Sequence, residues 1–199
     1  MSKNLVMVFT RNPELGKVKT RLAKTIGDQS ALNIYKFLLE HTEKIIKFLN
    51  CDKAVFYSIE IRHNDLWNES IYQKYQQQGD DLGIRMSNAF QNAFENDYEK
   101  VVIVGSDLFD LKAKHIEDAF SKLNNHDVVI GPAQDGGYYL LGMKNLHADL
   151  FSNKVWGTSS VFKDTINDLK TESVFLLDQL NDIDTYDDMK DNHTLKTLI

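Results

Sequence analysis

Residues 101–107 read Val-Val-Ile-Val-Gly-Ser-Asp: four consecutive β-branched residues stop at a glycine, and a hydroxyl and a carboxylate follow. A short apolar run that ends at a turn residue is typical of a strand buried on both faces of a parallel sheet. In open α/β sheets, ligands bind beyond the carboxyl ends of the strands. This stretch therefore predicts a central strand with candidate functional groups at its carboxyl end.

On both sides of this strand, apolar runs of strand length alternate with stretches of helical periodicity. The runs predict strands over residues 5–9, 54–59, 127–130, 138–143 and 173–177. Helices are expected from about residue 19 and over 28–49, 81–94, 112–123 and 160–169, with Asp28 and Asp81 as caps and a capping box at 185–188 before a last helix. This alternation predicts an α/β protein: a three-layer α/β/α sandwich with a mostly parallel mixed sheet and residues 1–199 as a single domain.

The composition disfavours several classes of protein. With 42% hydrophobic and 11% aromatic residues the chain has enough apolar surface for a core, unlike disordered chains. Its single cysteine, Cys51, rules out an intramolecular disulfide framework. The net charge of −6 disfavours nucleic acid as the partner. The first apolar run is too short for a signal peptide and no stretch could span a membrane, so we expect a cytoplasmic protein.

The loop after the first strand gathers positive charge. Residues 10–22 read Thr-Arg-Asn-Pro-Glu-Leu-Gly-Lys-Val-Lys-Thr-Arg-Leu, and the first 28 residues hold six basic but only two acidic side chains. Arg11, Lys19 and Arg21 are suited to phosphate, because arginine offers a planar fork of donors and lysine a mobile point charge. The loop is not a Walker A motif, since Lys17 is followed by valine. The alternative interpretation is a solvated basic loop.

Two further loops carry carboxylates at the same expected edge. Asp107 follows the central strand and is a candidate Mg²⁺ ligand, because Mg²⁺ takes one or two carboxylates together with substrate phosphates. Asp135 precedes Gly136 and Gly137, where the backbone can approach a ligand closely, so it could accept a proton or orient a hydroxyl. The simpler alternatives are a helix cap at Asp107 and an ordinary tight turn at 135–137.

Three other segments give weaker signals. The loop 78–87 places Arg85 at the start of a helix, where it could reach phosphate or a base. Trp156 could form an aromatic wall or simply pack. Asp184 could add a metal ligand, although the capping box explains that segment without function. The six histidines show no metal-ligand spacing, and the sequences Gly-x-Ser-x-Gly and Gly-x-Gly-x-x-Gly are absent.

These motifs, at residues 9–22, 78–86, 105–111, 131–142 and 182–188, occur in the order seen in one family. The chain resembles the bacterial selenodomain-associated glycosyltransferase-like family (radical-SAM/selenodomain-associated transferase type 1) over nearly its whole length. It is similar, more distantly, to molybdenum-cofactor guanylyltransferases and phospholactate guanylyltransferase. The resemblance implies the nucleotide-diphospho-sugar transferase fold, of the glycosyltransferase-A type.

The resemblance also implies roles for single residues. The nucleotide would be bound by residues of three loops: Thr10, Arg11, Gly16, Lys19, Arg21, Gly79, Asp81, Arg85 and Ser106. Asp107 would hold the metal, Mg²⁺ or Mn²⁺, with Asp184 as a second candidate, while Gly136, Gly137 and Trp156 would face the sugar or acceptor. The chain departs from the family pattern after Asp107, where Leu108 and Phe109 replace Cys-Pro, and at Ile84 and Tyr186, which replace Glu and Pro.

Three functions remain open at this point. The first is a metal-dependent transferase that acts on a nucleotide sugar, with Lys19 and Asp135 as catalytic residues and a small-molecule acceptor as the second substrate. The alternative is a nucleotidyltransferase that joins a nucleoside triphosphate to a phosphorylated acceptor. A nucleotide-binding protein without turnover is the third. The sequence carries no signal for the oligomeric state.

Overall fold

The computed structural model describes residues 2–199 and is built around one seven-stranded sheet. Along the sheet the strands stand in the order β3-β2-β1-β4-β6-β5-β7. Their bounds are β1 Asn4–Thr10, β2 Asp52–Tyr57, β3 Gln73–Gln76, β4 Lys100–Gly105, β5 Val128–Pro132, β6 Tyr138–Met143 and β7 Val174–Leu176. Only β6 runs antiparallel to its neighbours β4 and β5; the other pairs are parallel. The mostly parallel mixed sheet is therefore confirmed.

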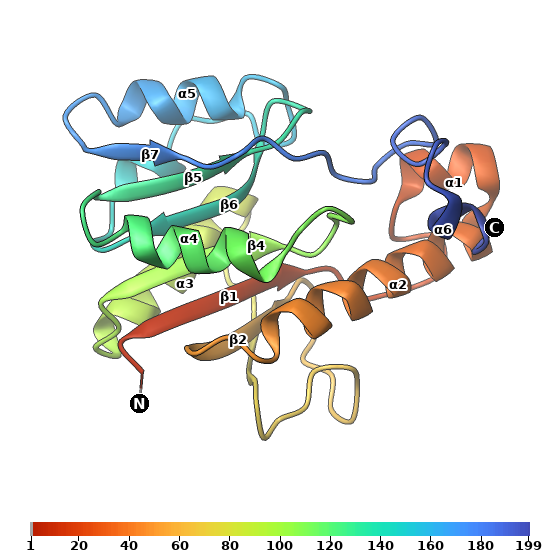
Figure 1. Ribbon diagram of the computed structural model, residues 1–199, viewed down its shortest axis with the longest axis horizontal. Helices are drawn as coiled ribbons and strands as arrows, with labels where there is room; N and C mark the ends of the chain where they lie inside the picture. Colours follow the sequence, from red (N-terminus) through yellow and green to blue (C-terminus); the bar gives the residue numbers. More distant parts are fainter. Residues whose placement is uncertain (1) are drawn as a thin grey trace.

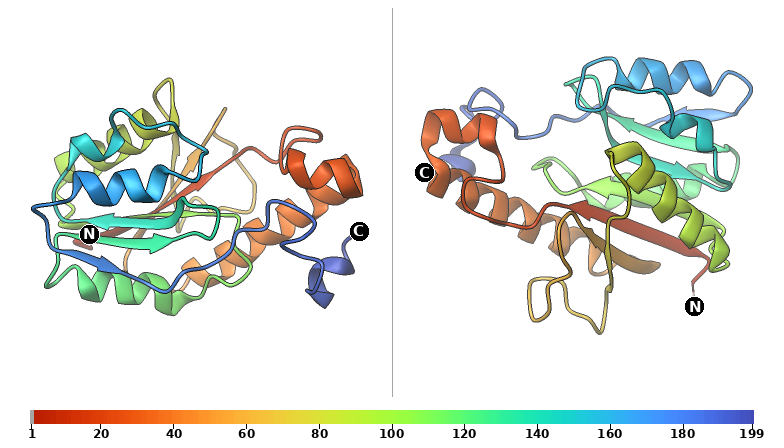
Figure 2. Two further views of the ribbon diagram at one scale, coloured as in Figure 1. Left: turned by 90° about the horizontal axis from the view of Figure 1, so that it is seen from above. Right: turned by 180° about the vertical axis from the view of Figure 1, so that it is seen from behind.

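Helices cover both faces of the sheet (Figures 1 and 2). One face is covered by α2 (Asp28–Ile46) and α4 (Ala113–Lys122), and the other by α3 (Leu82–Glu95), the 3₁₀ helix η1 (Ala148–Phe151) and α5 (Val161–Asp168). The side chains of β4 alternate between the two layers, because successive residues of a strand point to opposite faces. Val102 and Val104 pack with α2 and α4, whereas Val101 and Ile103 pack with α3 and η1. The three-layer arrangement expected from the sequence is confirmed.

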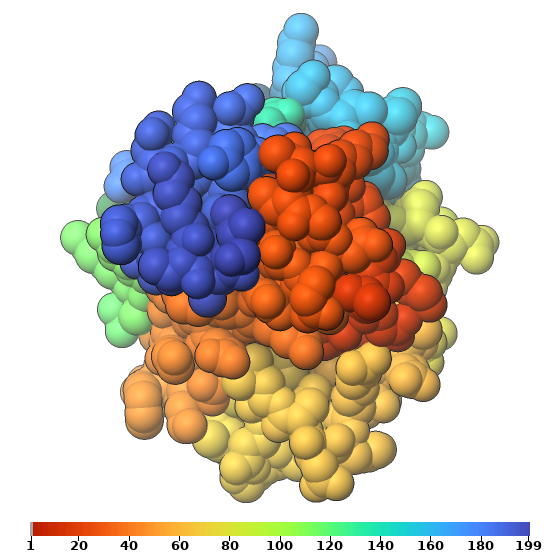
Figure 3. Space-filling view, turned by 90° about the vertical axis from the view of Figure 1, so that its right-hand side faces the viewer, coloured from red at the N-terminus to blue at the C-terminus, as the bar shows by residue number. Residues whose placement is uncertain are grey.

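A third hydrophobic cluster lies beyond the carboxyl ends of the strands. It joins α1 (Thr20–Ile26), the first half of α2 and the segment that ends in α6 (His193–Lys196). Its buried members are Leu22, Ile34, Leu38, Ile183, Met189 and Leu195. In Figure 3 the C-terminal residues (blue) lie directly against the segment of α1 and α2 (orange). The last part of the chain is therefore packed against the edge of the sheet where ligands are expected.

The structure corrects four expectations about the elements. The strand β3 and the helix η1 were not predicted. The long helix is capped at Gly27, with Asp28 as its first residue, and it ends at Ile46, three residues before the expected end. Residues 185–188 do not begin a helix: Asp188 Oδ2 accepts hydrogen bonds from the backbone N–H groups of Asp184 and Thr185, but the segment continues as turns. The last helix begins later, after the cap Asn192.

Among residues 2–199, none of the helices combines the length and the apolar character that crossing a bilayer requires.

We expect Leu38→Ala to lower the free energy of unfolding by about 2–5 kcal/mol, because the side chain is fully buried where α2 meets the C-terminal segment. Urea unfolding followed by circular dichroism measures the change. Phe48→Ala is the matched control: this ring is 85% exposed, so a change within about 0.5 kcal/mol is expected. Equal losses in the two variants would contradict the assigned packing.

Candidate active site

A cleft of about 780 Å³ opens at the carboxyl edge of the sheet, within the roughly 300–1,000 Å³ typical of small-molecule sites. It lies beside the ends of β1, β2, β4 and β6 and the first turn of α3. Of the site residues expected from the sequence, nine line it: Thr10, Arg11, Asp81, Arg85, Ser106, Asp107, Asp135, Gly137 and Trp156. Gly16, Lys19, Arg21, Gly79, Gly136 and Asp184 are outside its lining.

Tyr35 of α2 fixes the loop that follows β1. Its hydroxyl accepts a hydrogen bond from the backbone N–H of Arg11 (2.9 Å) and shares one with Thr10 Oγ1 (3.0 Å). Burial, reinforced by the negative charge of Asp107, raises the pKa of Tyr35 to about 12, so the hydroxyl keeps its proton. Ser106 Oγ lies 3.4 Å from Thr10 Oγ1 and connects this loop to β4. Tyr35 of α2 thus positions two nucleotide-binding candidates, Thr10 and Arg11.

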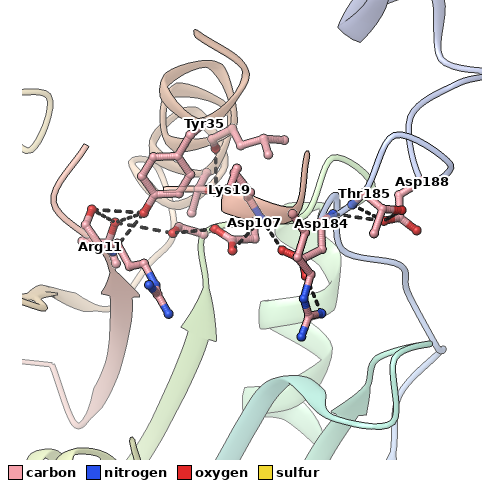
Figure 4. A network of polar contacts seen from close by, with 12 residues as sticks. Arg11, Lys19, Tyr35, Asp107, Asp184, Thr185 and Asp188 are labelled. Carbon is pink, nitrogen blue, oxygen red and sulfur yellow. Dashed lines mark hydrogen bonds and ion pairs between the residues drawn. The ribbon is translucent and has the colours of Figure 1, made fainter. Parts of the chain in front are cut away.

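Lys19 and Asp107 form the central ion pair of the site (Figure 4). The Lys19 side chain is only 3% exposed, and its Nζ lies 2.7 Å from Asp107 Oδ2 and 3.9 Å from Asp184 Oδ1. Lys19 caps α1 in the left-handed conformation, with φ of 49°, which costs energy for a residue with a Cβ. Strained backbone of this kind is concentrated at functional sites. The solvated-loop interpretation is therefore wrong for Lys19.

Other basic residues of the first loop are already paired. Arg21 binds Asp184 (2.8 Å), and Glu14 binds both Lys17 (2.8 Å) and Arg62 (3.3 Å). Within residues 2–199, by contrast, the side chains of Arg11 and Arg85 form no ion pair although both line the cleft. These two guanidinium groups are thus available to an anion.

Asp182 is a cleft residue that sequence analysis passed over in favour of Asp184. The residue between them, Ile183, donates a backbone hydrogen bond to Asp107 O (3.1 Å), and the Ile183 side chain packs in the third hydrophobic cluster. The flanking carboxylates separate: Asp184 pairs with Arg21, while Asp182 lines the cleft. Burial, and then the charges of Asp135 and Asp107, raise the pKa of Asp182 to about 6. The sequence shows two acidic residues spaced two positions apart, but it does not show which of them faces the cleft.

The first turn of α3 is held against two other loops. Asp81 caps the helix by accepting from Ile84 N (2.8 Å), as expected, and Arg85 Nε donates to Gly79 O (2.8 Å). Gly79 has φ of 137°, and a Cβ there would lie 2.6 Å from the Ile84 side chain, so only glycine fits. The Trp156 ring packs on Gly83, where a Cβ would lie 2.5 Å from it. Gly79 and Trp156 therefore shape the cleft through packing.

The Asp-Gly-Gly turn is equally constrained. Asp135 Oδ1 accepts from Gly137 N (2.8 Å), and Gly136 has φ of 89°. A Cβ on Gly136 would lie 2.3 Å from Ser159 O, so the turn packs closely on the loop that carries Trp156. The turn geometry expected from the sequence is present, and Asp135 still lines the cleft.

The carboxylates fit a hard divalent cation only in part. Among residues 2–199 no three His, Cys, Asp or Glu side chains lie close enough to hold a metal by themselves. Asp107 and Asp182 both line the cleft, and Asp182 Oδ1 is buried without a hydrogen-bond partner. Since Mg²⁺ commonly binds one or two carboxylates plus phosphate oxygens, this oxygen-only donor set suits an ion that arrives with a nucleotide.

We expect Tyr35→Phe to lower the free energy of unfolding by about 1–3 kcal/mol, because the backbone of Arg11 loses its hydrogen-bond partner. Urea unfolding provides the measurement. Tyr75→Phe is the control, since its hydroxyl bonds only the exposed Gln73 side chain. A cost for Tyr35→Phe no larger than for this control would contradict the positioning role of Tyr35.

The raised pKa of Asp182 predicts that the free energy of unfolding depends on pH. The folded pKa of about 6 lies above the unfolded value, so this carboxyl binds more protons in the folded state and its own contribution to stability falls as pH rises between about pH 4 and pH 6. At one pKa unit per about 1.4 kcal/mol, the loss is on the order of 2 kcal/mol. Urea unfolding in EDTA at pH 4.5 and 7.5 measures it. Asp182→Asn is expected to be relatively more stable at pH 7.5; an unchanged difference from wild type at both pH values would contradict the assignment.

Similarity to solved structures supports this architecture. A crystal structure of a candidate nucleotide-diphospho-sugar transferase from Desulfovibrio desulfuricans G20 is 31% identical, with a TM-score of 0.88 over 100% of this chain and 94% of that one. The 4-diphosphocytidyl-2C-methyl-D-erythritol synthase of Anaerococcus prevotii DSM 20548 shares the fold at 11% identity and a TM-score of 0.58, covering 94% and 92% of the two chains. The protein thus has the nucleotide-diphospho-sugar transferase fold.

Curated relatives are transferases by name. The 2-phospho-L-lactate guanylyltransferase of Methanocaldococcus jannaschii is 32% identical over 73% of this chain, and that of Methanocaldococcus vulcanius is 28% identical over 71%. The chain spans 62% of the length of each of these relatives. Residues 41–158, more than half of the chain, match a protein family described as "Uncharacterized protein conserved in bacteria (DUF2064)". By this match the chain belongs to that family.

Proposed function

We propose that the protein is a nucleotidyltransferase that joins a nucleoside triphosphate to a small phosphorylated acceptor and releases pyrophosphate. The ion pair between the buried Lys19 and Asp107, set beside a cleft with two unpaired arginines, is the observation that carries the proposal. The names of the guanylyltransferase relatives favour this reaction over the glycosyl transfer to which the sequence inclined.

The basic side chains of the cleft suit a triphosphate. Lys17 also lines the cleft but is paired with Glu14, whereas Arg11 and Arg85 line it without ion-pair partners within residues 2–199. Guanidinium groups bind phosphate oxygens through paired, charge-assisted hydrogen bonds. These residues would hold the β- and γ-phosphates, which leave as pyrophosphate, and would stabilise the charge that develops there.

Lys19 is suited to the reacting phosphate. Its Nζ lies 2.7 Å from a carboxylate oxygen of Asp107, which lines the cleft, so a phosphate brought to Asp107 also approaches the ammonium group. A buried, pre-positioned cation stabilises transition-state charge without reorganisation. Tyr35 and the left-handed backbone at Lys19 would keep this geometry fixed before substrate binds.

The proposed step balances as a simple displacement. An oxygen of the acceptor phosphate attacks the α-phosphorus, a P–O bond forms, and the bond from the α-phosphorus to the bridging oxygen of pyrophosphate breaks. The attacking phosphate oxygen is already ionised near neutral pH, so the reaction needs no general base. Asp135, which sequence analysis proposed as a proton acceptor, then serves to bind the acceptor. Catalysis is mainly positioning and charge stabilisation.

We further propose Mg²⁺ or Mn²⁺ as the cofactor, held by Asp107 and Asp182; Asp184, the second candidate from the sequence, is paired with Arg21 outside the cleft lining. When bound, the ion would neutralise phosphate charge and hold the two substrates in place.

Finer expectations from the sequence stay proposals: membership of the selenodomain-associated group, one domain over 1–199, a cytoplasmic location and no nucleic acid partner. The released product distinguishes the two transferase reactions, because nucleotidyl transfer releases pyrophosphate and glycosyl transfer releases a nucleoside diphosphate.

The test incubates the protein with each nucleoside triphosphate, Mg²⁺ and a panel of phosphorylated acceptors, and in parallel with nucleotide sugars and the same acceptors. Acceptor-dependent pyrophosphate supports the proposal. Nucleoside diphosphate released only from nucleotide sugars would favour glycosyl transfer, and nucleotide binding without either product would favour a non-catalytic binding protein.

We expect Lys19→Ala to lower kcat/KM for pyrophosphate release by about 10²-fold or more, the usual cost of removing one transition-state donor. Lys24→Ala is the matched control, because Lys24 is an exposed lysine of the same helix outside the cleft. Thermal melts confirm that both variants are folded. A folded Lys19→Ala protein with wild-type kcat/KM would exclude the catalytic role of Lys19.

A further inference from the structure

Charge is unevenly distributed along the cleft. Its basic lining residues, Arg11, Lys17 and Arg85, lie on the side of β1 to β3 and the first turn of α3, together with Asp80 and Asp81. The opposite side is formed by β5 and β6 and by the loops around residues 135, 157 and 182. Its charged lining residues within 2–199 are Asp135 and Asp182, with no Lys, Arg or His. The half of the cleft left for the acceptor is therefore acidic.

Aromatic residues contribute to this acidic half. Tyr138, Tyr139 and Trp156 belong to its lining, but Tyr139 is only 4% exposed and packs in the core. Trp156 is held in place by its packing on Gly83, and the hydroxyl of Tyr139 donates to Asp178 O (3.1 Å), so neither ring is free to turn away. Rings placed beside carboxylates recognise ammonium groups, through cation–π attraction together with charge pairing.

The nearby lysines cannot reverse this charge. Lys154 belongs to the loop of Trp156, but its side chain is 1% exposed and its Nζ is paired with Asp168 of α5. Lys19 is paired with Asp107. Asp135 is the carboxylate of this half that the proposed metal ion leaves free, so a carboxylate ligand placed beside it would meet a like charge.

We propose that the acceptor is a phosphate monoester that carries a cationic amine at its far end, of the phosphoethanolamine or phosphocholine class, and that the chain rejects phosphorylated carboxylic acids. This inference rests on the proposed nucleotidyl transfer and specifies its second substrate. The acceptor phosphate attacks the α-phosphorus, pyrophosphate leaves, and the amine, which takes no part in the bond changes, binds Asp135 and the ring of Trp156. By this inference the acceptor differs from the 2-phospho-L-lactate that names the relatives.

The test compares three acceptors with the same nucleotide and Mg²⁺: phosphoethanolamine, ethyl phosphate, whose far end is uncharged, and 2-phospho-L-lactate. We expect kcat/KM for pyrophosphate release to be at least tenfold higher with phosphoethanolamine than with either other compound. Equal rates with ethyl phosphate, or a preference for 2-phospho-L-lactate, would overturn the inference while leaving nucleotidyl transfer intact.

Calorimetric titration with the same three compounds, in the presence of nucleotide, separates the inference from the proposed function. If no acceptor yields pyrophosphate but phosphoethanolamine binds selectively, the nucleotidyl transfer fails and the amine site stands. If no acceptor yields pyrophosphate and phosphoethanolamine binds no more tightly than the other two, both fail.

Variants of Asp135 assign the selectivity to a residue. Asp135→Asn keeps an oxygen to accept from Gly137 N and is expected to abolish the preference for the amine. Asp135→Lys is expected to shift the preference to 2-phospho-L-lactate. Glu117→Lys makes the same change of charge on the exposed face of α4, away from the cleft, and is expected to keep wild-type selectivity. A shift of selectivity in the Glu117 variant as large as in the Asp135 variants would attribute the preference to net charge and overturn the inference.

Discussion

The ion pair between Lys19 and Asp107 is the constraint on which the site depends. A lysine that is 3% exposed is costly to bury without a partner, and its partners Asp107 and Asp184 come from two distant segments. The pair therefore ties the loop after β1, the loop after β4 and the C-terminal segment to one point at the edge of the sheet. The third hydrophobic cluster packs around the same junction and keeps these segments in register.

The same junction explains why the cleft can hold charges of both signs. Arg21, Lys17 and Arg62 are balanced by Asp184 and Glu14, so the basic loop adds little net charge of its own. Arg11 and Arg85 keep their charge on one side, and Asp135 and Asp182 on the other. A substrate pair with a polyanionic donor and a cationic acceptor tail matches this division without any rearrangement of the protein.

The central fold could be predicted because its signals are local. Residues 101–104 of β4 are all apolar and buried on one face or the other, so the strand can be recognised from this run alone. The strand β3 could not be predicted in the same way, because Gln-Lys-Tyr-Gln is polar and pairs only with β2 at the edge of the sheet. The false helix start at 185–188 shows that hydrogen bonds typical of a cap form in a turn as well.

The sequence predicted many of the residues of the site but not how they are arranged. Arg11, Asp107 and Asp135 stand where strand ends place them, and the sequence showed those strand ends. The burial of Lys19 depends on a left-handed backbone and on a carboxylate 88 positions away, which no local pattern encodes. The roles of Asp182 and Asp184 differ because Ile183 enters a cluster that exists only in the folded chain.

The ties to Asp184 have a consequence for the order of events during synthesis. Arg21 and its partner Asp184 lie 163 positions apart, and the segment around Ile183 supplies both a cleft carboxylate and part of the third cluster. The sheet can pair its strands β1 to β4 while translation continues, because those strands are already outside the ribosome. The cleft cannot be completed until the segment around Ile183 emerges, so the growing chain is expected to pair these strands before it can bind nucleotide.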